Sequence, residues 1–360
     1  MNRVFTAICA LALCGCVSQP ELQTLYVGTY GTAIHVLSYN PQDGSLAQTD
    51  SIPSLDASYI AFGETPGTLY AVSERGEASG INFFRSGGEG WTLEASSSGT
   101  GADPCYVSVI PGSGITVTAD YSSGSFTVFS TEPATLGKVL QQERFEGSHI
   151  HQAREIPASI LEAAGIEGRY ILISDLGCDL IRVEKLCPGE DTVLRQVAVI
   201  PCGEGSGPRH MEFNPAESVL YCLTELSGEV LVWKIANAGG EPSFEELQRL
   251  KADGYDAAGS ADIHLHPSGK WLYTSHRLRG DGISIIDVLE GGLLEKSAYL
   301  PTGIHPRNFT FSPDGTRVLV ACRDSRSIEV YDIDPVTGFL SDSFQRFEFA
   351  SDGPVCLLFE

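Results

Sequence analysis

Residues 205–225, GSGPRHMEFNPAESVLYCLTE, decide the fold of this chain. Two strand-like runs, 209–213 and 219–225, flank the polar turn NPAES, which is the pattern of an antiparallel hairpin. A hairpin returns the end of its second strand to the start of its first strand. Arg209 and Glu225 are therefore expected to lie together at one end of the pair, and we expect chemistry at that end.

Versions of this hairpin recur along the chain. Their first strands are SYIAF, CYVSV, HIHQA, RHMEF, DIHLH, RNFTF and VCLLF, which begin at Ser58, Cys105, His149, Arg209, Asp262, Arg307 and Val355. The centres of these seven segments lie 44 to 60 residues apart, a spacing typical of propeller blades. A third strand and a more polar fourth strand follow each hairpin. The sequence thus predicts an all-β fold, a seven-bladed β-propeller with four antiparallel strands per blade.

The two ends of the chain each carry half a repeat. VCLLF at 355–359 has no second strand after it, and TLYVGTY at 24–30 has the pattern of the missing one. The N- and C-terminal strands should therefore share one blade, which closes the ring and removes its open edge. One interruption stands out: residues 157–165 begin with Pro and end with Gly, as a short helix does. This helix should lie on the face opposite Arg209 and Glu225.

Composition limits the partners. The 360 residues hold 46 acidic and 23 basic side chains, a net charge of −23, which argues against nucleic acid because phosphate binding needs clustered Lys and Arg. An anionic substrate would need local Arg residues to reverse the sign of the field. No Cys or His spacing typical of zinc is present. We expect one propeller domain at 24–360 that is monomeric and uses no cofactor or metal.

The N-terminus has the pattern of an export signal. Asn2 and Arg3 precede an apolar run at 4–13, and LCGC at 13–16 matches a bacterial lipobox. We expect a signal peptide at 1–16, a lipid on Cys16 and a tether at 17–23, which would anchor the protein in the cell envelope, at the outer membrane or the periplasmic face. A plain secretory signal and a chance apolar start are the alternatives, and the latter implies a cytoplasmic protein.

The other cysteines divide into two groups. Cys105, Cys222, Cys322 and Cys356 lie in apolar strands and are expected to be buried thiols. A disulfide among Cys178, Cys187 and Cys202 is left open.

The rim of the channel gathers polar residues. In a propeller the starts of the first strands and the ends of the second strands converge around the central channel. These positions hold His149, Arg209, Asp262 and Arg307 on first strands, and Glu74, Asp120, Asp175, Glu225, Arg277 and Arg323 on second strands. His151 shares a strand face with His149. Four Arg residues therefore crowd one rim of an Arg-poor chain.

Each of these residues also has a structural interpretation. Acids end the second strand in four consecutive blades, so Glu225 could accept hydrogen bonds from turn amides. Arg209 and Arg307 could form salt bridges between blades. The pair His149 and His151 could be buried core residues. A second HxH motif at 264–266 shows that this pattern is not unique to the start of one first strand.

If the rim is a site, its parts suggest ester chemistry. Arg residues recognise phosphate or carboxylate and can stabilise an oxyanion. A neutral His or an ionised Glu can activate water as a general base. No G-x-S-x-G motif is present, which disfavours a serine acyl-enzyme. Direct attack by water on a small anionic ester or lactone fits these residues best.

The chain resembles the seven-bladed propeller lactonases, which include propeller-type 6-phosphogluconolactonase and carboxy-cis,cis-muconate cyclase. The likeness covers nearly all of the chain after the signal, through YVGTY at 26, SHIHQ at 148, SDLGCDLI at 174, GPRHMEFNP at 207, LTELSGEVLVW at 223 and PRNFTFSPDG at 306. It departs from the usual pattern at Ser148, where Pro is common, and at Asp120 and His276, where Asn is common.

The resemblance implies a site and a reaction. Matching motifs assign proton transfer to His151 and Glu225, and assign the carbonyl or anion to Arg209. We expect His149, Asp175, His210, Arg277 and Arg307 to bind substrate. The implied reaction is hydrolysis of a sugar-acid lactone such as 6-phosphogluconolactone, although an export signal favours an unphosphorylated lactone. A muconate-type lactonising cyclase and a non-catalytic binding propeller are the alternatives.

Overall fold

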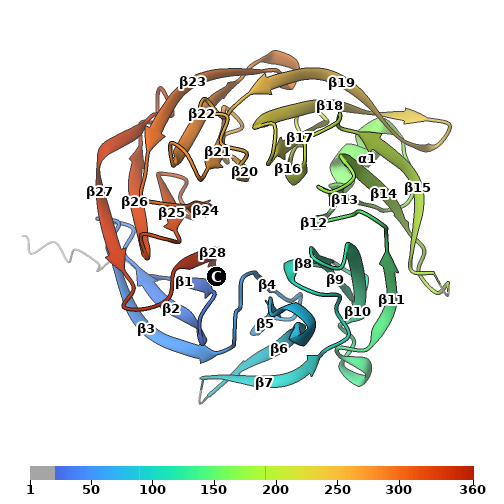
Figure 1. Cartoon of the computed structure of the whole chain (residues 1–360), viewed down its shortest axis with the longest axis horizontal. Coiled ribbons are helices and arrows are strands. Elements are labelled where there is room, and N and C mark those ends of the chain that lie inside the picture. Colours follow the sequence, from blue (N-terminus) through green and yellow to red (C-terminus); the bar gives the residue numbers. More distant parts are fainter. Residues whose placement is uncertain (1–20, 89, 191) are drawn as a thin grey trace, which may run out of the picture.

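The computed structural model describes residues 21–88, 90–190 and 192–360, which form a ring of seven four-stranded antiparallel sheets (Figure 1). The predicted fold is confirmed. The expected signal peptide, Cys16 and most of the tether lie outside the described residues. No helix within the described ranges is long and apolar enough to cross a membrane.

In each sheet the first strand lines the channel and the fourth lies outermost. Six blades are each formed by four consecutive strands. The first of these contains β4 (Ile60–Phe62), β5 (Thr68–Ser73), β6 (Gly80–Gly87) and β7 (Gly90–Ser97), and the second contains β8 (Pro104–Ile110), β9 (Ile115–Asp120), β10 (Ser125–Ser130) and β11 (Val139–Arg144). The third contains β12 (Ile150–Glu155), β13 (Tyr170–Asp175), β14 (Leu180–Leu186) and β15 (Leu194–Pro201).

The next three blades follow the same order. They contain β16 (Pro208–Asn214), β17 (Val219–Thr224), β18 (Glu229–Ala238) and β19 (Glu241–Lys251); β20 (Ser260–Leu265), β21 (Trp271–His276), β22 (Gly282–Val288) and β23 (Leu294–Pro301); and β24 (Pro306–Phe311), β25 (Arg317–Cys322), β26 (Ser327–Ile333) and β27 (Leu340–Glu348). The hairpin expected at 209–225 is thus β16 and β17.

The seventh blade joins the two ends of the chain. Its sheet order is β28 (Pro354–Phe359), β1 (Gln23–Thr29), β2 (Ala33–Tyr39) and β3 (Leu46–Pro53), and Figure 1 places the C-terminus next to β1. Leu25 pairs with Phe359 and Val27 with Leu357. The predicted closure of the ring is confirmed, because the C-terminal strand completes the blade that the N-terminal strands begin.

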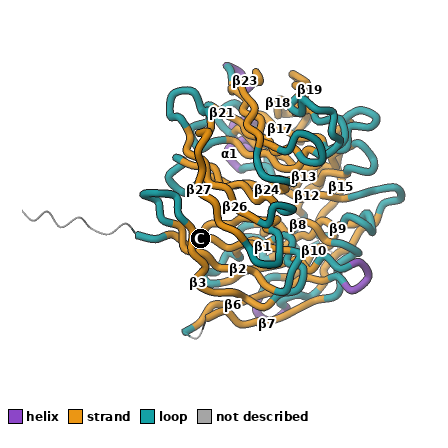
Figure 2. The backbone as a smooth tube through the Cα atoms, turned by 60° about the vertical axis from the view of Figure 1, so that its left-hand side comes forward, coloured by secondary structure: helices purple, strands orange, loops and turns teal. Residues whose placement is uncertain are grey.

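The core lies between neighbouring blades, because both faces of each sheet pack against the next sheet. One apolar cluster joins β13 and β14 to β16, β17 and β18, with Met211, Leu231 and the buried Trp233 among its members. Seen from the side, loops connect the strands on both faces of the ring (Figure 2). Because these loops are short, a ligand can approach either face of the ring.

The predicted helix is present as α1 (Ala158–Ala164), between β12 and β13. Pro157 precedes it and Gly165, at φ 65°, ends it in the left-handed conformation that glycine tolerates. Ile160 and Leu161 are buried in the core cluster just described. The helix follows the end of a first strand, so it lies at the channel mouth opposite Arg209.

The seven cysteines within the described residues are all free thiols, so no disulfide joins Cys178, Cys187 and Cys202. Cys105, Cys222, Cys322 and Cys356 are buried, as expected.

Candidate active site

The rim at the start of the first strands brings Arg209 and Glu225 together. Arg209 lies in β16, and Glu225 follows β17 directly. The Arg209 Nε donates a hydrogen bond of 2.7 Å to Glu225 Oε2. The juxtaposition predicted from the hairpin is confirmed.

A β-bulge near the start of the first strand turns one extra side chain towards the channel. The ladder skips one residue between Pro208 and His210, and similar skips occur in β8, β12 and β24. A bulge re-aims side chains in this way. The skipped residues are Cys105, His151, Arg209 and Arg307, and all four line one small cavity in the channel. The bulges therefore build the site.

The acidic residues at the ends of the second strands look equivalent in the sequence, but their side chains face different sides of the strand. Asp120 and Asp175 are the last paired residues of their strands, opposite Pro104 and Ile150, whereas Glu225 lies one residue beyond the pair formed by Pro208 and Thr224. A shift of one residue turns a strand side chain to the other face.

Asp120 and Asp175 consequently lie inside the blades and not at the rim. The Asp175 carboxylate is fully buried, pairs with Arg182 at 2.6 Å, and accepts a hydrogen bond from the hydroxyl of Ser148. Asp120 accepts from Thr118 and Thr127. The oxygens of Asp175 are engaged by the blade's own side chains, which favours a structural role over the expected substrate binding.

Two guanidinium groups hold Glu225. Besides Arg209, the Nη2 of Arg277 lies 3.2 Å from Glu225 Oε2. Burial alone would raise the pKa of the Glu225 carboxyl, but Arg277, Arg209 and Arg307 lower it below its usual value. Glu225 is therefore ionised and is a weak base. Burial and the neighbouring Arg209 lower the pKa of Arg277 to about 9.

The two paired arginines are also fixed by backbone carbonyls. Arg209 donates to the carbonyl oxygen of Ala261, and Arg277 Nε donates to that of Gly259 at 2.9 Å. The Arg277 Nη1 also lies 3.3 Å from His305 Nε2. Each of the two guanidinium groups is thus held at two or three of its nitrogens, which fixes its position.

Arg307 differs from them. Its guanidinium lies 5.5 Å from the centre of the Tyr30 ring, and within the described residues none forms a hydrogen bond or ion pair with it. Tyr30 in turn donates a hydrogen bond of 2.9 Å to Glu74. Burial opposes the charge of Arg307, yet Tyr30 and Glu74 raise its pKa, so it remains a cation. Arg307 has donors available for an anion.

Two histidine rings lie beneath the arginines. The ring centres of His151 and His210 are 5.0 Å apart, and both side chains are buried. Among the described residues, none partners His151 Nδ1 or His210 Nε2. The cavity that both residues line has a volume of about 10 Å³, which is roughly the space one water molecule needs.

Asp262 orients His210. The His210 Nδ1 lies 2.7 Å from Asp262 Oδ1, and because an ionised carboxylate only accepts, this nitrogen carries the proton. The other nitrogen, Nε2, is then a free acceptor towards the cavity. Burial and Arg209 lower the pKa of His210 to about 4 despite Asp262. Burial likewise holds the pKa of His151 well below its ordinary value, so both rings are neutral near pH 7.

His149 lies at the edge of the site. It stacks on Tyr121 with ring centres 4.5 Å apart, and its Nδ1 lies 3.0 Å from the Tyr121 carbonyl oxygen. Tyr121 also packs edge-on against His151 at 5.9 Å. The paired histidines of the sequence motif therefore differ: His151 faces the buried cavity and His149 covers it from the rim.

Sequence reasoning placed most of the assembled residues at the rim, namely His149, His151, Arg209, His210, Glu225, Arg277 and Arg307. It gave no role to Tyr30, Tyr121 or His305, and it mentioned Asp262 without its partner. Tyr30, Tyr121 and Arg277 each follow a second strand directly, as Glu225 does. The position directly after a second strand is therefore the sequence signal that identifies Tyr30 and Tyr121.

The donor set of the site suits anions and not metal ions. Among the residues the structure describes, no group of three His, Cys, Asp or Glu side chains is arranged to hold a metal. Guanidinium groups around one carboxylate, above neutral imidazoles, can bind an anionic ester, stabilise an oxyanion and accept a proton.

Known proteins share this architecture over the full length. The profile of the family described as lactonase, 7-bladed beta-propeller, matches residues 24–359. A 6-phosphogluconolactonase of Formosa agariphila is 29% identical over 336 residues, which cover 88% of this chain and 94% of the relative. A 6-phosphogluconolactonase of Bacillus subtilis is 27% identical, with 88% of this chain and 93% of the relative covered.

Solved structures agree. The crystal structure of a proposed 6-phosphogluconolactonase of Bacteroides fragilis superposes with a TM-score of 0.85 at 32% identity, covering 96% of this chain and all of the other. The periplasmic gluconolactonase PpgL of Pseudomonas aeruginosa gives a TM-score of 0.84 at 26% identity, with 94% and 99% covered. The chain belongs to the seven-bladed β-propeller lactonase family and is an enzyme of the lactonase class.

Proposed function

We propose that this protein hydrolyses a sugar-acid lactone at the Arg-rich rim by direct attack of water. The observation that carries the proposal is the arrangement of Arg209, Arg277 and Glu225 directly above two neutral histidines that each keep a nitrogen without a partner among the described residues. The phosphorylated lactone 6-phosphogluconolactone is the substrate we would test first, because two relatives carry the name of its hydrolase.

His210 is the better placed general base. A base is effective when a third group orients it, and Asp262 does so for His210, whereas neither a described acid nor a described carbonyl orients His151. In the proposed step, water attacks the lactone carbonyl and its proton moves to His210 Nε2. The ring opens when the ring oxygen leaves and takes that proton, which yields the hydroxy acid. His151 would orient the same water.

The arginines would stabilise the negative charges of the substrate and of the oxyanion. Arg307 has unoccupied donors and would bind the carbonyl oxygen as it becomes an oxyanion, or the anionic group of the substrate. Glu225 holds Arg209 and Arg277 in place, and both guanidinium groups engage its Oε2. We therefore assign Glu225 to positioning.

An unphosphorylated aldonolactone is the second candidate. The expected export signal favours an extracytoplasmic substrate, and one structural relative is named a periplasmic gluconolactonase. The rim chemistry is the same for both substrates, so only a direct comparison of rates separates them.

The test is the disappearance of lactone in a pH-stat, with phosphorylated and plain aldonolactones and a muconate dicarboxylate as the substrate panel. We expect hydrolysis of at least one lactone above its spontaneous rate, and a fall of at least tenfold in Glu225→Gln. Glu184→Gln is the matched control, because Glu184 is a buried carboxyl in β14, away from the rim. No rate on any lactone would overturn the proposal, and turnover of the dicarboxylate alone would favour the cyclase.

A further inference from the structure

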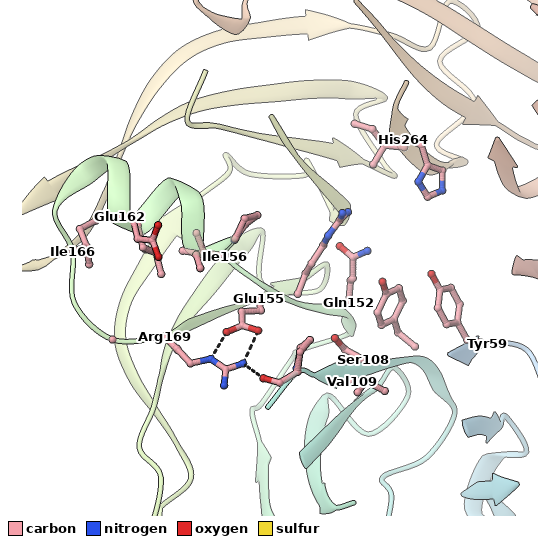
Figure 3. A pocket seen from close by; sticks show the side chains of 18 of the residues that line it. Tyr59, Ser108, Val109, Gln152, Glu155, Ile156, Glu162, Ile166, Arg169 and His264 are labelled. Atoms are coloured by element: carbon pink, nitrogen blue, oxygen red, sulfur yellow. Dashed lines mark hydrogen bonds and ion pairs between the residues drawn. The ribbon is translucent and has the colours of Figure 1, made fainter. Parts of the chain in front are cut away.

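A larger cavity opens at the other mouth of the channel. It has a volume of about 900 Å³ and is lined by the later residues of first strands, such as Ser108, Arg154 and His264, and by α1 (Figure 3). The rim, by contrast, is built from the starts of those strands. Tyr59 lines both this far cavity and the small cavity beneath Arg307. The two sites therefore occupy opposite ends of one channel.

The charged groups that line the far cavity are paired with one another, apart from the exposed carboxylate of Glu162 on α1. Arg154 pairs with Glu212 at 2.6 Å, and Arg169 pairs with Glu155 at 2.5 Å. His264 lies 3.0 Å from an oxygen of Asp262 and 3.7 Å from one of Glu212. Burial opposes the charge of His264, but these two carboxylates raise its pKa to about 10, so it is a paired cation. Among the described residues that line this wall, no unpaired cation remains to attract an anion.

Uncharged polar groups remain available on the channel side. Tyr59 and Tyr106 pack with ring centres 4.1 Å apart, and their hydroxyl groups interact with each other and, at Tyr106, with the Gln152 side chain. The Gln152 oxygen also accepts from the backbone nitrogen of Met211 at 2.6 Å. Each hydroxyl oxygen can still accept a further hydrogen bond from a ligand. Figure 3 shows Tyr59, Gln152 and His264 on this side.

Apolar side chains lie on the opposite side of the cavity, next to Glu162 and the Arg169–Glu155 ion pair. Ile156, Leu161 and Ile166, at and around α1, line it together with Val109 from β8. In Figure 3, Ile156 and Ile166 lie near the helix, away from Tyr59 and His264. A cavity of this size, with a polar end and an apolar end, matches a small molecule that has both parts.

We propose that the far cavity is a second ligand site, for an uncharged molecule that joins a hydroxylated ring to an apolar group, as a glycoside does. The hydroxyl groups would meet Tyr59, Tyr106 and Gln152, and the apolar group would lie against α1. The proposal is independent of the reaction at the rim.

Calorimetric titration with three probes tests the chemistry. Phenyl β-glucoside has both parts, glucose lacks the apolar group, and phenyl phosphate replaces the sugar with an anion. We expect phenyl glucoside to bind at least tenfold more tightly than either of the others. No binding of phenyl glucoside, or tighter binding of phenyl phosphate, would overturn the proposal.

Variants locate the site. Ala158 is exposed on α1 and lines the cavity, so Ala158→Trp should block phenyl glucoside, whereas Ser159→Trp, on the same helix but outside the lining, should bind it as the wild type does. Tyr106→Phe keeps the ring and should weaken binding at least threefold. Glu225→Gln should bind normally. Loss of binding in Glu225→Gln with full binding in Ala158→Trp would place the ligand at the rim and refute the inference.

Discussion

Three arginines meet at the rim, and their surroundings give them different tasks. Arg209 and Arg277 share Glu225 and donate to backbone carbonyls, so their positions are fixed. Arg307 lies over the Tyr30 ring and forms no hydrogen bond or ion pair among the described residues. A substrate anion would gain most from the group whose donors are unoccupied, because it replaces no existing hydrogen bond.

This difference predicts how two variants should change the kinetics of lactone hydrolysis. Arg307→Gln should raise KM for an anionic lactone about tenfold, a loss of about 1.4 kcal/mol, with a smaller change in kcat. Arg277→Gln should mainly lower kcat, because it releases Glu225. Arg195→Gln, at an exposed position away from the channel, is the control. Equal effects of the two rim variants on KM would contradict the division of tasks.

Bulges in the first strands explain which parts of the site were predictable. Apolar alternation, turn residues and half repeats at both ends identify the seven blades, their four strands and the closure, since these depend on periodicity. A bulge adds one residue and changes which side chains face the channel. The sequence does not mark that shift, so the link between Asp262 and His210 was missed. Asp175 was assigned to the rim because the sequence pattern does not separate the last paired residue of a second strand from the residue that follows it.

The closing blade depends on a glycine. Gly28 of β1 pairs with Cys356 of β28, and a Cβ at Gly28 would lie 2.5 Å from the carbonyl oxygen of Ala57 in the next blade. That backbone atom cannot move aside cheaply.

Gly28→Ala should therefore lower the free energy of unfolding by about 2 kcal/mol, seen as a lower urea midpoint. Gly87→Ala is the matched control, because a Cβ there has no neighbour nearer than 4.0 Å. Equal midpoints for the two variants would show that the junction between blades tolerates the extra carbon.

Across the whole molecule, the channel buries several neutral histidines. The pKa of His210 is about 4, and burial together with Arg277 and Arg323 lowers that of His305 to about 3. Between about pH 6.5 and 4 the unfolded chain binds protons at these positions that the folded chain does not bind. The free energy of unfolding must therefore fall as the pH drops through this window, and the contribution of these two histidines is fully retained above pH 6.5.

We expect the urea midpoint to fall steadily from about pH 6.5 to about pH 4, with His210 alone contributing about 3 kcal/mol. The lowered pKa values of Glu225 and Asp262 act in the same direction, because the unfolded carboxyls also take up protons first. His210→Gln should flatten the pH dependence. A midpoint independent of pH would show that these rings are not buried in their neutral form.

His264 has a raised pKa, so its effect on stability has the opposite dependence on pH. Its contribution to the free energy of unfolding is lost as the pH rises towards about 10.

The channel as a whole connects two ends of different chemistry. The rim gathers cations above neutral histidines, whereas the cations of the far cavity are all paired with carboxylates among the described residues. Asp262 lies between them, with one oxygen on His210 and the other near His264. In a chain with a net charge of −23, the rim is where an anionic lactone would find favourable charges.

The central claim is that the arginine and carboxylate cluster and the histidines beneath it act as one lactone-hydrolysing unit. The most direct test is kcat/KM for lactone hydrolysis by the wild type, Glu225→Gln, His210→Gln and the double variant in one assay. We predict that each single variant loses at least tenfold and that the double variant loses little more than the worse single variant, because residues of one catalytic unit are not additive. Losses that multiply fully, or a wild-type rate no faster than spontaneous hydrolysis, would contradict it.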